Sequence, residues 1–193
     1  MNLTEVFDFA NRYHQGQTKK GTEYPYIYHP MSVAATALKY GGSPEQVAAA
    51  LLHDTIGDGK VSQDEIAQKF GAETARLVFG FSDPEMPEGA DTGWRAMKQA
   101  YLNKVREIDE ATLFVMACEE LHDGSELLHD LKYQGPEVWK RYPVHGMEVF
   151  WYYRELLAIF SKRLTADRYR PLVAEFGAMM KAMKGIVFEG AVY

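Results

Sequence analysis

The stretch from Ser43 to Asp54, SPEQVAAALLHD, has the pattern of one capped helix. Ser43 is followed three residues later by Gln46, the spacing of a capping box, in which each residue's side chain bonds the other's backbone N–H. Pro44 falls at the first helical position, where its missing N–H costs nothing. The rest is rich in Ala and Leu and ends at the pair His53-Asp54. The stretch predicts a helix with two polar side chains at its C-terminal end.

Helical signals continue on both sides of this stretch. Ser62 and Glu65 repeat the capping pattern, and Gly41-Gly42 marks a turn. Apolar residues at helical spacing predict further helices: Leu113, Ala117, Leu121, Leu128 and Leu131; Val149, Phe150, Tyr153, Leu156, Leu157 and Phe160; and Leu172, Phe176, Met179 and Met180. The sequence has no Asn-Gly hairpin signal and no alternating apolar run. An all-α fold follows.

The size and composition favour one domain over residues 1–193. The chain is 47% hydrophobic and 25% charged, as globular proteins are, so disordered, collagen-like and disulfide-scaffold classes are excluded. The single cysteine, Cys118, cannot form an internal disulfide, which fits a reducing compartment. No apolar run approaches the roughly 20 residues that span a bilayer, and the N-terminus lacks a basic signal region. We therefore expect a cytoplasmic protein with no membrane partner.

The charge balance bears on the partners of the protein. The chain has 27 acidic and 21 basic side chains, a formal net charge of −6. A protein that binds duplex nucleic acid normally carries a dense basic face, whereas the densest basic cluster here is Lys19-Lys20. Duplex nucleic acid is disfavoured as a partner. A small phosphorylated ligand is compatible, since a few local cations can outweigh a modest global charge.

Three features carry residues suited to chemistry. The first is His53-Asp54, and the second is His29, which precedes Pro30 and is therefore expected to lie outside the helical conformation. The third is a polar face of one helix, made of Glu119, His122, Asp123 and Glu126. Oxygen and imidazole ligands on one face suit Mn²⁺ or Fe²⁺. None of the three features is decisive alone, because each is also typical of a structural or surface role.

Short motifs follow one another in a fixed order along the chain. They read HQGQTKK at residues 14–20, PYIYHP at 25–30, LLHD at 51–54, FG at 70–71, GFSD at 80–83 and CEELHD at 118–123. Further blocks are Trp94-Arg95, Lys98, Tyr101-Leu102 and WYYR at 151–154. This order resembles the HD-domain superfamily of metal-dependent phosphohydrolases, in particular the hydrolase domain of RelA/SpoT-type alarmone enzymes and the small alarmone hydrolases. The resemblance covers about residues 5–160 and implies a single HD-type helical bundle.

The resemblance implies a role for individual residues. It makes His29, His53 and Asp54 ligands of a divalent metal, most simply Mn²⁺, and it places Glu119 where the family has a further Asp ligand. The basic pair Lys19-Lys20 matches residues that contact phosphates in the family. Asp123 takes the place of an Asn that faces the substrate, and Asp58 that of a residue that activates the attacking water.

The sequence also departs from the family at three positions in this site. The family follows His-Asp, after two residues, with Glu-Asp, but this chain has Gly57-Asp58, so the Glu is missing. The other two departures are Glu119 for Asp and Asp123 for Asn. The main hypothesis is a phosphohydrolase of a nucleotide, with the 3′-pyrophosphate of ppGpp-like alarmones as one candidate substrate. The alternative is a catalytically impaired protein that binds a nucleotide or a protein partner.

The last part of the chain lies beyond the resemblance. Residues 168–193 are expected to form a C-terminal helical extension. It could cap the bundle, cover the cleft or form an interface, so a homo-oligomer stays open.

Overall fold

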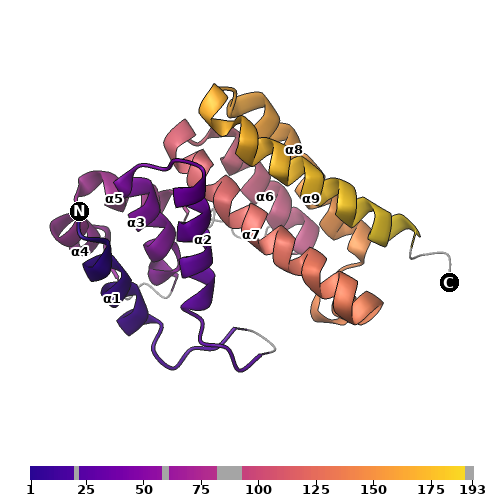
Figure 1. The fold of residues 1–193 in the computed structure, drawn as a ribbon, viewed down its shortest axis with the longest axis horizontal. Helices are drawn as coiled ribbons and strands as arrows, with labels where there is room; N and C mark the ends of the chain where they lie inside the picture. The colour runs from indigo at the N-terminus through magenta and orange to yellow at the C-terminus, as the bar shows by residue number, and fades with distance from the viewer. Residues whose placement is uncertain (20–21, 58–60, 82–92, 190–193) are drawn as a thin grey trace. The chain divides into compact units, whose positions relative to one another are not determined.

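The computed structural model of the protein describes residues 1–19, 22–57, 61–81 and 93–189. Throughout these residues the secondary structure is helical, with one isolated β-bridge between Thr18 and Pro25 and no strand, so the all-α prediction is confirmed. The α-helices are α1 (Leu3–Tyr13), α2 (Tyr28–Lys39), α3 (Pro44–Leu52), α4 (Gln63–Phe70), α5 (Ala72–Gly80), α6 (Trp94–Glu107), α7 (Glu110–Gln134), α8 (Gly146–Arg163) and α9 (Arg170–Glu189) (Figure 1). The 3₁₀ segments are η1 (His53–Ile56), η2 (Gly135–Arg141) and η3 (Asp167–Tyr169). Within the described ranges, no helix has the length and apolar character needed to cross a membrane.

The helices form two compact units that alternate along the sequence. The first comprises Met1–Ser82 and Asp109–Glu119, and the second comprises Asp83–Ile108 and Glu120–Tyr193. The boundary between Glu119 and Glu120 falls inside α7. One domain over the whole chain stays a prediction.

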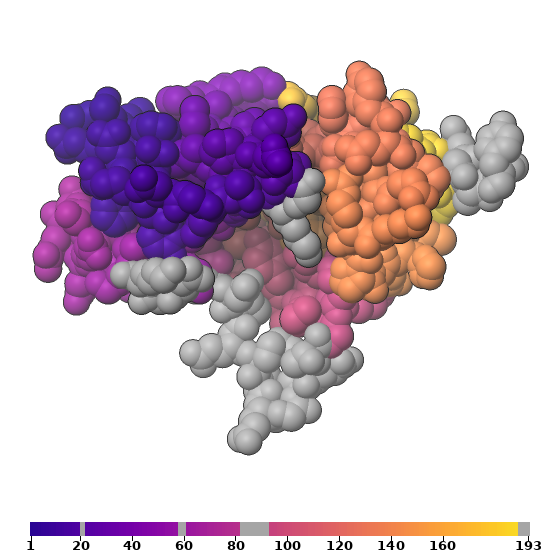
Figure 2. Space-filling view, turned by 90° about the horizontal axis from the view of Figure 1, so that it is seen from below, coloured from indigo at the N-terminus to yellow at the C-terminus, as the bar shows by residue number. Residues whose placement is uncertain are grey.

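The first unit is built around α3. The Ser43–Gln46 capping box is present as expected, and all six residues from Val47 to Leu52 are buried. Helices α1, α2 and α5 pack on α3, which lies between α2 and α5 in Figure 1. Helix α1 buries Val6 and Ala10 and leaves most of its other residues at the surface, shown in indigo in Figure 2. Burying a Val or Leu side chain contributes about 1.5–3 kcal/mol, so α3 is the main hydrophobic anchor of this unit.

The turn between α2 and α3 is the predicted Gly41-Gly42 pair. Gly41 has a φ of +74°, which favours glycine. A Cβ atom on Gly42 would lie 2.9 Å from Phe114 Cε1 and 3.0 Å from the Ala37 carbonyl oxygen. Because Gly42 has no side chain, Phe114 on α7 can pack directly against this turn.

The second unit has its own core, formed mainly by α8 and α9. The expected apolar stripe of α8 is buried at Val149, Tyr153, Leu156 and Phe160. Phe160 packs edge-to-face on Phe176 of α9, with ring centroids 5.2 Å apart. Residues 170–189 of the expected C-terminal extension are helical, and they pack along α8.

Candidate metal centre

The pair His53-Asp54 lies where α3 ends and the 3₁₀ segment η1 begins. On a continuous α-helix, adjacent side chains point about 100° apart and do not converge. At this helix end they do: His53 Nε2 lies 3.1 Å from Asp54 Oδ2. The change from α to 3₁₀ geometry therefore brings both side chains of the pair to one point.

His29 reaches the same point from the first turn of α2. The expectation that His29 lies outside the helical conformation is wrong, because α2 begins at Tyr28. Pro30 falls within the first turn, where backbone N–H groups have no intrahelical partner, so the proline removes no hydrogen bond. His29 Nε2 lies 3.2 Å from His53 Nε2 and 3.5 Å from Asp54 Oδ2.

Glu119 completes the cluster from α7. Its Oε1 lies 3.7 Å from His53 Nε2, and ligand atoms of His29, His53 and Glu119 all lie within 4.8 Å of one another. The first unit thus brings together all four residues that the sequence analysis names as ligands. Two imidazole nitrogens and two carboxylates form a donor set that suits a first-row divalent cation, so the residues fit such an ion.

The ring of His53 has a defined orientation. Its Nδ1 lies 2.9 Å from the Ala50 carbonyl oxygen, which can only accept a hydrogen bond, so Nδ1 carries the proton. The Nε2 atom is thereby directed at His29, Asp54 and Glu119. A histidine that binds a metal through one nitrogen commonly donates from the other in this way.

The metal-free cluster holds one extra proton, on His53. Burial lowers the pKa of His53, but the charge and hydrogen bond of Asp54 and the charge of Glu119 outweigh it and raise the pKa to about 9. Burial and the charge of His53 lower the pKa of His29 to about 4. For Asp54, burial is outweighed by the charge and hydrogen bond of His53, which hold its pKa well below its usual value. These shifts describe the metal-free state as an ion pair between the buried His53 and the half-buried Asp54, beside a neutral His29.

This protonation state predicts a pH-dependent cation affinity. A metal needs the lone pair of His53 Nε2, so binding at about pH 7.5 should release about one proton per ion. The affinity should rise with pH and level off near the His53 pKa of about 9. The stability of the metal-free protein should depend on pH in the opposite direction. The raised pKa of His53 stabilises the fold fully below pH 6.5, and this stabilisation is lost as the pH rises through about 9.

Calorimetric Mn²⁺ titrations in two buffers of different ionisation enthalpy count the protons released. Release of no proton at about pH 7.5, or an affinity that falls between pH 7 and 9, would contradict the assignment of the proton to His53.

Tyr26 fixes the carboxylate of Asp54. Its hydroxyl donates a hydrogen bond to Asp54 Oδ2 at 2.7 Å. A short backbone pairing holds Tyr26 in place: Tyr26 N donates to Gln17 O, and Lys19 N donates to Tyr24 O, each at 2.9 Å. Tyr26 is not among the site residues predicted from the sequence. Its position within the PYIYHP motif was the only available signal, because the contact with Asp54 joins residues 28 apart.

Replacing Tyr26 with phenylalanine should weaken Mn²⁺ binding about tenfold. Loss of an outer-shell hydrogen bond typically costs 10–100-fold in metal affinity, because the ligand is no longer held in place. Tyr24→Phe is a matched control, since Tyr24 is 66% exposed. The measurement is calorimetric titration with Mn²⁺, and equal affinity for Tyr26→Phe and Tyr24→Phe would rule out the positioning role.

The remaining site residues predicted from the sequence are Lys19, Lys20, Asp58 and Asp123. Lys19 lies beside the cluster: its charge contributes to the low pKa of His29, and its Nζ is 5.5 Å from the Tyr28 ring centroid. Lys20 and Asp58 lie outside the described residues. Asp123 is exposed on α7, in the second unit.

The block that includes Trp94, Lys98 and Tyr101 forms a cluster of its own within the second unit. Lys98 Nζ lies 4.4 Å from the Tyr152 ring centroid, and the rings of Trp94 and Tyr101 pack on the same tyrosine. The Tyr152 hydroxyl donates to Glu120, which is buried. Burial raises the pKa of Glu120 to about 7, against the lowering effect of Lys98 and Tyr152. No pattern in the sequence predicted that Glu120 is buried.

Comparison with known proteins gives one family and several relatives. The model of the HD domain family matches residues 7–141. A Synechocystis protein named as a probable guanosine-3′,5′-bis(diphosphate) 3′-pyrophosphohydrolase is 30% identical over 186 residues, covering 88% of this chain and 23% of the relative. The human guanosine-3′,5′-bis(diphosphate) 3′-pyrophosphohydrolase MESH1 is 32% identical over 145 residues, covering 74% of this chain and 76% of MESH1.

The same fold is found in a solved structure of a metazoan orthologue of SpoT that hydrolyses ppGpp. The TM-score is 0.68 at 17% identity, covering 92% of this chain and 93% of the orthologue. The chain spans only 11% of the similar Aquifex aeolicus hydrolase and 23% of the Synechocystis relative.

Proposed function

Since the chain belongs to the HD domain family, we propose that it is a metal-dependent phosphohydrolase that acts on a nucleotide. The observation that carries the proposal is the convergence of His29, His53, Asp54 and Glu119 within the first unit. Four buried or half-buried side chains with this donor chemistry have no evident structural need to meet. Bringing these side chains together removes water from polar groups and places groups of like polarity in contact. A bound cation would offset both costs.

We propose that these four residues hold one divalent cation and that the cation is Mn²⁺. Mixed imidazole and carboxylate ligands are compatible with Mn²⁺ and Fe²⁺. Such an ion, when bound, lowers the pKa of water and polarises a phosphoryl oxygen. Of the chain's own residues, His53 is held in the ligating tautomer by Ala50, and Asp54 is oriented by Tyr26.

The substrate we propose is a nucleotide that carries a 3′-pyrophosphate, with ppGpp as the first to test. The relatives' names give this substrate, and Lys19 beside the metal cluster supplies a cation for a phosphate. Lys20 would add a second cation, Asp123 would face the substrate, and Asp58 would accept a proton from the attacking water. Hydrolysis breaks the ester bond between the 3′-oxygen and phosphorus, and it yields GDP and pyrophosphate.

We also propose a cytoplasmic location. Cys118 is buried and free, and burial raises the pKa of its thiol, which makes it unreactive. A protein without a disulfide suits a reducing compartment.

The experiment uses metal-stripped protein, to which Mn²⁺ is added before ppGpp. We expect saturable binding of one ion and release of pyrophosphate that depends on Mn²⁺ and stops with a chelator. GTP and ATP serve as controls without a 3′-phosphate. Binding of Mn²⁺ without hydrolysis of any nucleotide would favour the impaired binding protein. Absence of Mn²⁺ binding would overturn the proposal as a whole.

A further inference from the structure

His14 is a buried histidine with an open hydrogen-bonding position. It lies at the C-terminal cap of α1 and is 4% exposed. Its Nδ1 lies 2.8 Å from Gln17 Oε1, an atom that can only accept, so Nδ1 carries a proton. In the neutral ring Nε2 is then a bare acceptor, and among the described residues it has no hydrogen-bond partner. Leaving such a buried group without a hydrogen bond destabilises the fold, so a partner outside the protein is expected.

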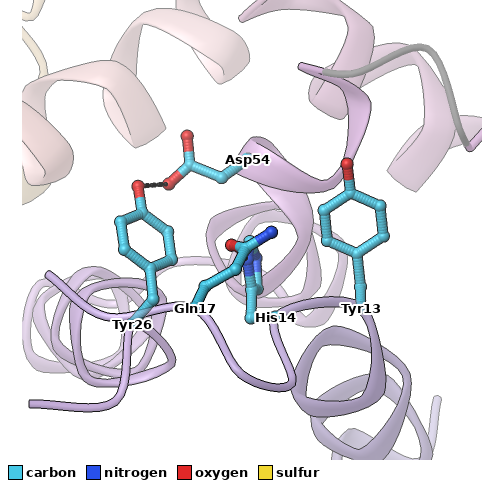
Figure 3. Close-up of a pocket in the computed structure, with 5 residues that line it drawn as sticks. All are labelled: Tyr13, His14, Gln17, Tyr26 and Asp54. Atoms are coloured by element: carbon cyan, nitrogen blue, oxygen red, sulfur yellow. Dashed lines mark hydrogen bonds between the residues drawn. The ribbon is translucent and has the colours of Figure 1, made fainter.

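His14 lines a small polar pocket in the first unit. The pocket has a volume of about 130 Å³ and is lined by Tyr13, His14, Gln17, Tyr26 and Asp54 (Figure 3). The imidazole of His14 lies beside the rings of Tyr13 and Tyr26, with centroids 5.0 and 4.9 Å away. Figure 3 shows the Asp54 carboxylate on the same pocket, bonded to the Tyr26 hydroxyl. The pocket therefore connects His14 to a residue of the metal cluster.

The chemistry of the lining selects the occupant. The Asp54 carboxylate accepts a hydrogen bond from the Tyr26 hydroxyl, and the His14 Nε2 offers a lone pair. The Tyr13 hydroxyl and the Gln17 amide on the same pocket can also donate hydrogen bonds. His14 Nε2 and the Asp54 carboxylate both accept, however, so a molecule that joins these two groups must donate to each of them. A phosphoryl oxygen can only accept and would be repelled by Asp54. Water donates two hydrogen bonds, and a polar site of this volume is large enough for several water molecules.

We propose that ordered water fills this pocket and links His14 Nε2 to the Asp54 carboxylate, which makes His14 a positioning residue for Asp54. The inference rests on the proposed function only in taking Asp54 as a metal ligand. Asp54 is then held from two directions, directly by Tyr26 and through water by His14. Water-mediated links of this kind are nearly as strong as direct hydrogen bonds.

The first test needs no metal. Nitrogen-15 NMR of the metal-free protein should show His14 protonated at Nδ1, with an Nε2 signal shifted by an accepted hydrogen bond. A ring protonated at Nε2, or an Nε2 signal of a free lone pair, would overturn the inference.

The second test measures Mn²⁺ affinity by calorimetry in three variants. His14→Phe keeps a ring between Tyr13 and Tyr26 but removes both nitrogens, and it should weaken Mn²⁺ binding about tenfold. His14→Gln returns a polar group and should recover most of this loss. His129→Phe is the matched control, because His129 is exposed on α7 in the second unit, and it should bind as the parent protein does.

The variants separate a positioning role from a packing role. Parent-like affinity in His14→Phe would overturn the inference, and so would an affinity in His14→Gln as weak as in His14→Phe. Thermal unfolding of each metal-free variant shows that the fold is intact. Failure of the parent protein to bind Mn²⁺ would instead overturn the proposed metal site, while the NMR result would still decide whether His14 is bonded through water.

Discussion

Replacing His53 with alanine should abolish Mn²⁺ binding and lower hydrolysis of ppGpp by roughly 10³-fold or more. His53 Nε2 lies within 4 Å of each of the other three cluster side chains. A bound cation supplies several kcal/mol of transition-state stabilisation, and about 4 kcal/mol corresponds to 10³ in rate. Losing the central ligand should remove that contribution almost completely.

Two measurements check this result. Calorimetric titration of the metal-stripped variant should show no saturable Mn²⁺ binding, and pyrophosphate release should fall to the level seen with chelator. His129→Ala serves as a control, since it removes a histidine from an exposed position of α7. A His53→Ala protein that remains folded and binds one Mn²⁺ with unchanged affinity would mean that the cluster is not the metal centre.

The fold could be predicted well from local sequence signals. The capping box at Ser43, the N-cap at Ser62 and the turn at Gly41-Gly42 all lie where the sequence places them. Each of these signals depends on side chains and backbone groups within a few residues, so no knowledge of tertiary structure is needed. The apolar spacing also predicted the buried face of α8, because the apolar face of a helix in a globular protein packs against the core.

The conformation of His29 shows where a local rule is insufficient. The residue before a proline is disfavoured in a helix, which led to the expectation of an extended His29. In the structure His29 is helical all the same, and Pro30 in the first turn removes no intrahelical hydrogen bond. Helix α2 gives the histidine a fixed direction toward His53. Tertiary packing here outweighs a modest local preference.

Tyr26 and His14 could not be assigned from sequence for a different reason. Tyr26 reaches Asp54 across 28 residues, and His14 shares a pocket with Asp54 that exists only in the folded unit. Aromatic and histidine residues on a loop are equally typical of core packing. Only the contacts of the folded unit show that these side chains surround Asp54, a member of the cluster.

Glu119 was named as a departure from the family pattern, and the structure suggests how its longer side chain is accommodated. Its Oε1 lies within 3.7 Å of His53, so the added methylene does not prevent the carboxylate from reaching the cluster. Substitution of this ligand alone is therefore not a sufficient reason for loss of activity. The resemblance to the family also implies a carboxylate at the position of Gly57, where this chain has none.

Replacing Gly57 with glutamate should raise ppGpp turnover by about 10²–10⁴-fold, the usual contribution of a positioned general base. The backbone permits the change: Gly57 has φ −59° and ψ −31°, which any residue adopts. Among the described residues, only the Asp54 carbonyl oxygen would lie within 4 Å of a Cβ atom there, at 3.8 Å. The residue is exposed and lies three positions after Asp54, so a carboxylate has room and is close to the cluster.

Steady-state hydrolysis of ppGpp by Gly57→Glu and Gly57→Gln separates the carboxylate from the added bulk. An increase in ppGpp turnover in the glutamate variant alone, with unchanged Mn²⁺ affinity, means that the parent site is an alarmone hydrolase weakened by one missing base. Equal turnover in the parent and both variants would show that the missing carboxylate is not what limits the reaction. In that case the resemblance, which implies a neutral amide at the position of Asp123, gives a reason to test other phosphorylated substrates, since a carboxylate that faces a phosphate would be repulsive.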